Sequence, residues 1–108
     1  TETEVNGFDI DFRHNIHIYR LLHLIHEAAG QHAKELNRGW DDLHQDGLFW
    51  ALSKVHIVVH QYPKWNDKIT IQTWPKAHET LVFLRNYKVF SKAEDLLVSA
   101  SSEWMIVD

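Results

Sequence analysis

The stretch IHIYRLLHLIHEAAGQHAKEL, residues 16–36, decides how this chain folds. Apolar residues recur in it at three- and four-residue steps, which is the period of one face of a helix. This face comprises Ile18, Leu21, Leu22, Ile25, Ala29, His32 and Leu36, and it is widened by Leu24, Ala28 and Ala33. We therefore predict one long helix from Ile16 to Leu36. Asn15 is a favourable N-cap, and Asn37-Arg38-Gly39 is a favourable stop.

The segments on either side of this helix have the composition of strands. Before it, Val5 to Phe12 alternates apolar and polar residues, which predicts a half-buried strand. After a polar stretch from Trp40 to Asp46, which we expect to be irregular, β-branched and aromatic residues dominate. They predict four strands, separated by turns at Tyr62–Asp67 and Ser91–Asp95, over Leu48–Gln61, Lys68–Trp74 (ended by Pro75), Thr80–Phe90 and Leu96–Val107.

This order of elements predicts an α+β fold. Short turns join antiparallel neighbours, so the four consecutive strands are expected to form an antiparallel sheet. The wide apolar face of the helix must be buried on the concave side of that sheet. A curved antiparallel β-sheet wrapped around one long central helix is the arrangement of a hotdog domain, here spanning residues 1–108. Because such a sheet leaves exposed edges, we expect a second copy or domain to pair with it.

The composition excludes several classes of protein. The 108 residues include no cysteine, so the chain has no disulfide framework, thiolate metal site or cysteine nucleophile. A net charge of −4 without a block of basic residues argues against nucleic-acid binding. No apolar run reaches the roughly 20 residues of a membrane span, and we expect a cytoplasmic protein that does not bind membranes.

Several motifs resemble those of the acyl-acyl carrier protein thioesterase family. In the helix, the stretch from Leu24 to Ala33 is similar to the family's first helix, where glutamine often replaces His26. The remaining motifs run through the predicted strands and turns, and they are Phe49-Trp50-Ala51-Leu52-Ser53-Lys54-Val55, Tyr62-Pro63-Lys64-Trp65-Asn66-Asp67, Ile71-Gln72-Thr73-Trp74-Pro75, Arg85-Asn86-Tyr87 and Ala100-Ser101-Ser102-Glu103-Trp104-Met105.

This resemblance implies an enzyme that releases free fatty acids from fatty acyl thioesters of acyl carrier protein, in fatty acid biosynthesis, without a cofactor. Members of the family carry two hotdog domains in one chain, and this sequence resembles the first. Asp108 falls where the linker to the second domain would begin, and the absence of an initial methionine is compatible with a fragment. The family's catalytic asparagine-x-histidine motif, with its cysteine or acidic partner, belongs to the second domain.

One asparagine-x-histidine pair does occur here, as Asn15-Ile16-His17. Such a pair, placed at the beginning of a helix, can orient a water molecule and act as a general base. Asn15 and His17 are therefore the catalytic candidates within this chain. The alternative is that Asn15 caps the helix and His17 is exposed on its first turn, which we favour because the segment resembles the first domain.

For a substrate-binding cavity we predict Leu24, Ile25, Ala28, His32 and Trp50 as lining residues. Small and apolar helix residues would leave room for an acyl chain against the aromatic residues of the sheet. The alternative is that the aromatic residues, including Trp74, Trp104, Phe83 and Tyr87, are core or interface residues. His32 lies on the apolar face, so we expect it to be buried, hydrogen-bonded and neutral.

Two other groups of residues have a weaker claim to function. His23 and His26, and His56 and His60, are spaced like metal ligands, but neither pair has the acidic third ligand of a zinc site, so we predict no metal. The basic residues that could gather to dock an acidic carrier protein are Lys64, Lys68, Arg85 and Lys88, and a mixed solvated surface is the favoured alternative.

Three functions remain open from the sequence. The first is the acyl-binding half of a two-domain thioesterase. The second is a single hotdog module that dimerises and binds acyl thioesters without hydrolysing them. The third is a self-sufficient homodimeric thioesterase, acting on acyl carrier protein or coenzyme A thioesters, that uses Asn15 and His17.

Overall fold

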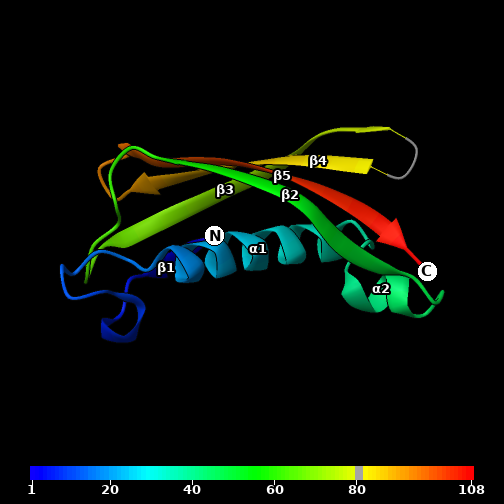
Figure 1. Cartoon of the computed structure of the whole chain (residues 1–108), viewed down its shortest axis with the longest axis horizontal. Coiled ribbons are helices and arrows are strands. Elements are labelled where there is room, and N and C mark those ends of the chain that lie inside the picture. Colours follow the sequence, from blue (N-terminus) through cyan, green and yellow to red (C-terminus); the bar gives the residue numbers. More distant parts are fainter. Residues whose placement is uncertain (80–81) are drawn as a thin grey trace.

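The computed structural model describes residues 1–79 and 82–108, so Thr80 and Leu81 of the predicted third strand lie outside the described residues (Figure 1). These described residues form one long helix, one short helix and five strands. In chain order the elements are β1 (Glu2–Glu4), a 3₁₀ turn (Gly7–Asp9), α1 (Ile18–Glu35), α2 (Trp40–His44), β2 (Phe49–Val59), β3 (Lys68–Glu79), β4 (Val82–Ser91) and β5 (Leu96–Val107).

The strands form a single sheet in the order β1-β3-β4-β5-β2, and every pairing is antiparallel. The sheet curves over α1, which lies along its concave face (Figure 1). The predicted α+β hotdog fold is therefore confirmed.

The expectation that every strand pairs with its successor is wrong for β2, which lies at the edge beside β5. Residues 60–67 carry the chain across the sheet from β2 to β3. This crossing is anchored because Pro63 is buried and its carbonyl accepts a 2.8 Å hydrogen bond from the backbone of Ile16.

The segment before α1 differs from its prediction. Val5–Phe12 is not a strand, and the first strand is the short β1, which pairs with β3. Two of the apolar residues of the alternation are outside, since Phe8 is 100% exposed and Phe12 is 87% exposed, whereas Val5 is buried in the core. The chain turns here because the buried carboxylate of Asp9 accepts hydrogen bonds from the backbone of Asn6 and from the side chain of Arg20, at 2.9 and 2.8 Å.

The ends of α1 also differ from the prediction. The N-cap position is His17, whose side chain makes no capping bond, and the helix begins at Ile18. Asn15 is not a cap, because its backbone forms a bridge with Lys64. At the other end the stop is confirmed, since α1 ends at Glu35 and Asn37 adopts a left-handed φ of 60°. The stretch after it is not irregular: α2 begins where the carboxylate of Asp42 accepts a 2.9 Å bond from the backbone of Gly39.

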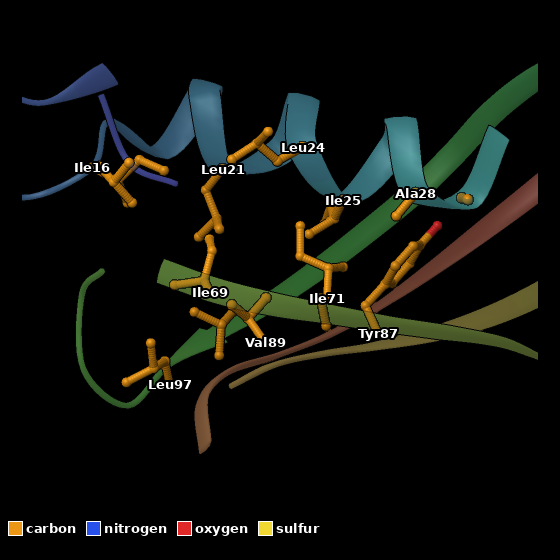
Figure 2. Close-up of a cluster of buried hydrophobic side chains, with 14 residues drawn as sticks. Ile16, Leu21, Leu24, Ile25, Ala28, Ile69, Ile71, Tyr87, Val89 and Leu97 are labelled. Atoms are coloured by element: carbon orange, nitrogen blue, oxygen red, sulfur yellow. The ribbon is translucent and has the colours of Figure 1, made fainter. Parts of the chain in front are cut away.

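The core lies between the middle of α1 and the strands β3, β4 and β5 (Figure 2). Its helix residues are Leu21, Leu24, Ile25, Ala28 and Ala29, and its main sheet residues are Ile69, Ile71, Tyr87, Val89, Leu97 and Val98. Burying each large aliphatic side chain stabilises the fold by roughly 1.5–3 kcal/mol. The two ends of the predicted apolar face project beyond this contact, which leaves Ile18 46% exposed and Leu36 50% exposed.

Strand β3 continues past Pro75, where the sequence predicted its end. The pairing with β4 shifts between Pro75 and Ala77, so Lys76 is an extra residue on this strand. A bulge tolerates proline because the local ladder is already interrupted. No helix in the described part of the chain combines the length and apolar character needed to cross a bilayer.

Candidate functional site

A cavity of about 840 Å³ lies between the C-terminal half of α1, the short helix α2 and the sheet. Helix α1 contributes small residues, Ala29, Gly30 and Ala33, and the strands contribute Trp50, Phe83 and Trp104. A side chain added at Gly30 would meet no atom within 4 Å, so the helix leaves this side of the cavity open. We call this cavity the aromatic groove.

The wall on the sheet side is a cluster of aromatic rings from three strands. The ring of Trp50 meets that of Phe83 edge to face, with centroids 5.1 Å apart, and that of Trp104 at 6.5 Å. The indole of Trp50 also donates a 2.8 Å hydrogen bond to the backbone carbonyl of Arg38, which ties β2 to the loop after α1. These contacts hold a rigid, largely apolar wall in place.

His26 is a polar group placed in these apolar surroundings. Its ring meets that of Trp104 edge to face, with centroids 5.4 Å apart. Its Nε2 atom is buried and has no hydrogen-bond partner within the described part of the chain. Burial, and to a lesser degree the neighbouring His23, lower the pKa of His26. The imidazole is therefore held in its neutral form at neutral pH.

Arg85 brings a positive charge to the groove. Its Nη1 atom donates to Nδ1 of His32 on α1, at 2.9 Å, and to the hydroxyl of Thr73 on β3, at 3.2 Å. A guanidinium only donates, so Nδ1 of His32 accepts and the ring is neutral in this contact. Burial lowers the pKa of the Arg85 guanidinium, although the nearby Tyr87 acts in the opposite direction.

The predicted lining residues fall into two places. Trp50 lines the groove, whereas Leu24, Ile25 and Ala28 belong to the core beneath β3 and β4. His32 is partly buried and does not line the groove itself, but it holds the lining residue Arg85. The reason is that the groove lies beside a neighbouring strip of α1, formed at helical spacing by His26, Ala29, Gly30 and Ala33, whereas Leu24, Ile25 and Ala28 face the sheet.

Several residues of the groove, Phe83 and Trp104 among them, were not among the lining residues predicted from the sequence. Phe83 lies two residues before Arg85 and four before Tyr87, so the alternation of β4 places all three on the concave face. Trp104 lies two residues after Ser102 and four after Ala100, so the alternation of β5 places these three on the concave face as well. This alternation was visible in the sequence. The part of α1 that borders the groove was not.

The two catalytic candidates lie at the other end of α1. The ring of His17 stacks on that of Tyr19, with centroids 5.0 Å apart, and the backbone of Asn15 donates to the carboxylate of Asp11. Neither residue lines the aromatic groove.

The basic residues considered for carrier docking do not form one patch. Arg85 lines the groove, and Lys88 lies on the opposite face of the sheet over the ring of Trp74. Lys68 borders a polar hollow beside β1 that also contains glutamates, and Lys64 lies in the turn before β3. In the described ranges, 1–79 and 82–108, no three His, Asp or Glu side chains are grouped so that they could hold a metal ion.

Comparison with known proteins places the whole chain in one family. Residues 1–108 match the acyl-ACP thioesterase N-terminal domain, where ACP is acyl carrier protein. An oleoyl-acyl carrier protein thioesterase of Coriandrum sativum is 22% identical over 96% of this chain and 30% of its own length. A palmitoyl-acyl carrier protein thioesterase of Gossypium hirsutum is 23% identical over 96% of this chain and 27% of its own length. The chain thus spans less than a third of these relatives.

Solved structures share the fold over the whole chain. An acyl-ACP thioesterase from Bacteroides thetaiotaomicron superposes with a TM-score of 0.96 and 26% identity, covering 100% of this chain and 44% of that one. A DHNA-CoA thioesterase from Staphylococcus aureus superposes with a TM-score of 0.92 and 17% identity, covering 100% of this chain and 72% of that one.

Proposed function

The chain belongs to the family of acyl-ACP thioesterase N-terminal domains, and from that premise we propose that it forms the acyl-binding half of a thioesterase. The enzyme hydrolyses fatty acyl thioesters of acyl carrier protein and releases free fatty acids. The acyl chain lies in the aromatic groove between α1 and the sheet.

The apolar character of the groove is the observation that carries this proposal. Its volume of about 840 Å³ falls within the range of small-molecule sites, roughly 300–1,000 Å³. Each methylene that leaves water for such a wall contributes about 0.8 kcal/mol. A long alkyl chain therefore gains much of its binding energy here.

The hydrolytic step is assigned to a second hotdog domain. Hydrolysis of a thioester needs an activated water or nucleophile and donors for the developing oxyanion. Among the described residues that line the groove, His26 is the side chain suited to act as a general base. Its Nε2 atom is buried, so we do not assign the hydrolytic step to it. The resemblance to the family implies a catalytic asparagine and histidine in a second domain, which supports this assignment, and no metal or cofactor enters this proposal.

Strand β2 is where we propose that this second domain, or a second copy, docks. It lies at the edge of the sheet and pairs on one side with β5. Its exposed apolar side chains are Phe49, Leu52, Val55 and Val58. A long apolar edge strand favours pairing with another strand.

The test is an assay of hydrolysis on a series of acyl carrier protein thioesters, with the protein as its gene encodes it. Release of free fatty acid that depends on acyl length supports the proposal. Binding of acyl thioesters without turnover would instead support the non-catalytic module. Turnover by the 108 residues alone, lost in His17→Ala, would support the self-sufficient homodimer and contradict the role of a second domain.

A further inference from the structure

The aromatic groove carries an excess of positive charge that an acyl chain does not need. Arg38, Lys76 and Arg85 line it, and among the described lining residues none is acidic. This is a local imbalance, because the chain as a whole has a net charge of −4. A ligand with an apolar body and one negative group would match this surface better than a neutral alkyl chain.

Arg85 is the most buried of these three cations. Arg38 and Lys76 are exposed at the rim, whereas Arg85 is partly buried and reaches from β4 to α1. Within the described residues its partners, His32 and Thr73, are both neutral. Holding a guanidinium away from water without a counter-ion is costly, and a bound anion would offset that cost.

The geometry also leaves room on the guanidinium for such an anion. Both hydrogen bonds of Arg85 to described residues start from Nη1. The edge formed by Nε and Nη2 is left for a further partner, and two parallel N–H donors on one edge fit the two oxygens of a carboxylate. His32 and Thr73 hold the side chain in position from two elements.

We propose that Arg85 anchors the carboxylate of a free fatty acid whose alkyl chain lies in the aromatic groove. The groove then retains the product of hydrolysis, so that free fatty acid competes with the acyl substrate. This inference rests on the proposed function, since it requires that the groove holds an alkyl chain.

The test compares decanoate with decanol, a neutral ligand of equal chain length, at pH 7.5 and below the micellar concentration. Binding to the 108-residue chain is followed by calorimetry and by tryptophan fluorescence, to which Trp50 and Trp104 in the groove contribute among the five tryptophans of the chain. We expect decanoate to bind about tenfold or more tightly than decanol, as a charge-assisted pair requires. Arg85→Gln should remove most of this preference, because the buried fork is lost while the rim cations Arg38 and Lys76 remain. Decanol binding that persists in this variant shows that the groove is still folded.

Two further variants sharpen the result. Arg85→Lys should retain only part of the preference, because an ammonium group cannot donate two parallel hydrogen bonds to one carboxylate as a guanidinium does. Lys88→Gln, on the same strand but on the opposite face, should retain the full preference.

Equal binding of decanoate and decanol to the unmodified chain would overturn the anchor while leaving the acyl groove supported. A preference of undiminished size in Arg85→Gln would overturn it as well. Failure of both ligands to bind would overturn the inference together with the proposed function. Competition by 4′-phosphopantetheine that depends on Arg85 would assign the anion site to the phosphate of the carrier arm instead.

Discussion

His26 on α1 and Trp104 on β5, which both line the groove, meet edge to face with ring centroids 5.4 Å apart, and Nε2 of His26 is buried without a described partner. This contact joins the helix to the sheet through a titratable group. Because burial lowers the pKa of His26 below its ordinary value of 6.5, the unfolded chain takes up this proton more readily than the folded chain.

This contact predicts how the stability depends on pH. The contribution of neutral His26 to the free energy of unfolding is fully present above about pH 6.5. It is lost as the pH falls through that value toward the lowered pKa of His26 in the folded state. His26→Leu should therefore remove part of the decline in unfolding free energy between pH 7.5 and 5.5, as measured by urea denaturation. At pH 7.5 the variant should differ from the unmodified chain by less than about 1 kcal/mol, since an unsatisfied nitrogen is replaced by an apolar group. An unchanged pH dependence, equal to that of the exposed control His56→Gln, would contradict this account.

The two isoleucines Ile25 and Ile18 of α1 provide a matched test of the core. Ile25 is fully buried, whereas Ile18 is 46% exposed. Ile25→Ala should lower the unfolding free energy by about 2–5 kcal/mol, because it removes apolar contacts and leaves a cavity. Ile18→Ala should cost less than about 1 kcal/mol. Similar losses for the two variants in denaturant titrations would mean that α1 is rotated relative to the arrangement described here.

The N-terminal turn depends on Asp9. Asp9 as a whole residue is 7% exposed, and its carboxylate accepts hydrogen bonds from the backbone of Asn6 and from the side chain of Arg20. Asp9→Ala should cost about 1–3 kcal/mol, because the groups that it serves lose their acceptor. The control Asp46→Ala, at an exposed position after α2, should remain within about 0.5 kcal/mol. Thermal denaturation of both variants distinguishes a structural carboxylate from a surface one.

Two tryptophans on opposite faces of the sheet test the aromatic groove. Trp50 lines the groove, and Trp74 lies on the outer face near Lys88. Trp50→Ala opens the aromatic wall, so acyl chains longer than the preferred length should bind better, by up to about 0.8 kcal/mol for each additional methylene accommodated. Trp74→Ala should leave the dependence on acyl length unchanged. An identical length profile in both variants, measured by binding of a series of acyl chains, would show that Trp50 is not part of the wall.

Much of the fold could be predicted because it depends on periods in the sequence. The apolar period of residues 18–36 was sufficient to predict α1, and the runs of β-branched and aromatic residues predicted β2 to β5. The alternation of Val5–Phe12 failed for a physical reason: Asp9 is bound by Asn6 and Arg20, so the polar residue is inside and Phe8 is outside. A period of two indicates a strand only where the apolar side is the buried side.

The candidate site was less predictable than the fold. Leu24, Ile25 and Ala28 have the right chemistry for an acyl-binding wall, but the sheet packs on them directly. The α1 residues that line the open space, His26, Ala29, Gly30 and Ala33, lie on a neighbouring strip of the helix, and Ala29 also belongs to the core. The difference depends on which strip of α1 the curved sheet covers. No local sequence pattern specifies how the sheet is placed on the helix.

The sequence by itself determined which segments form the helix and the four long strands, because backbone geometry imposes a repeat of 3.6 or 2 residues on any segment with one buried face. It also contained the family motifs. Only the tertiary structure decided that β2 pairs with β5 at the edge, that Arg85 reaches His32 across the fold, and that the groove opens beside the strip of α1 that includes His26 and Ala33. These relationships join residues distant in the chain, and they depend on the crossing of residues 60–67 and on the curvature of the whole sheet.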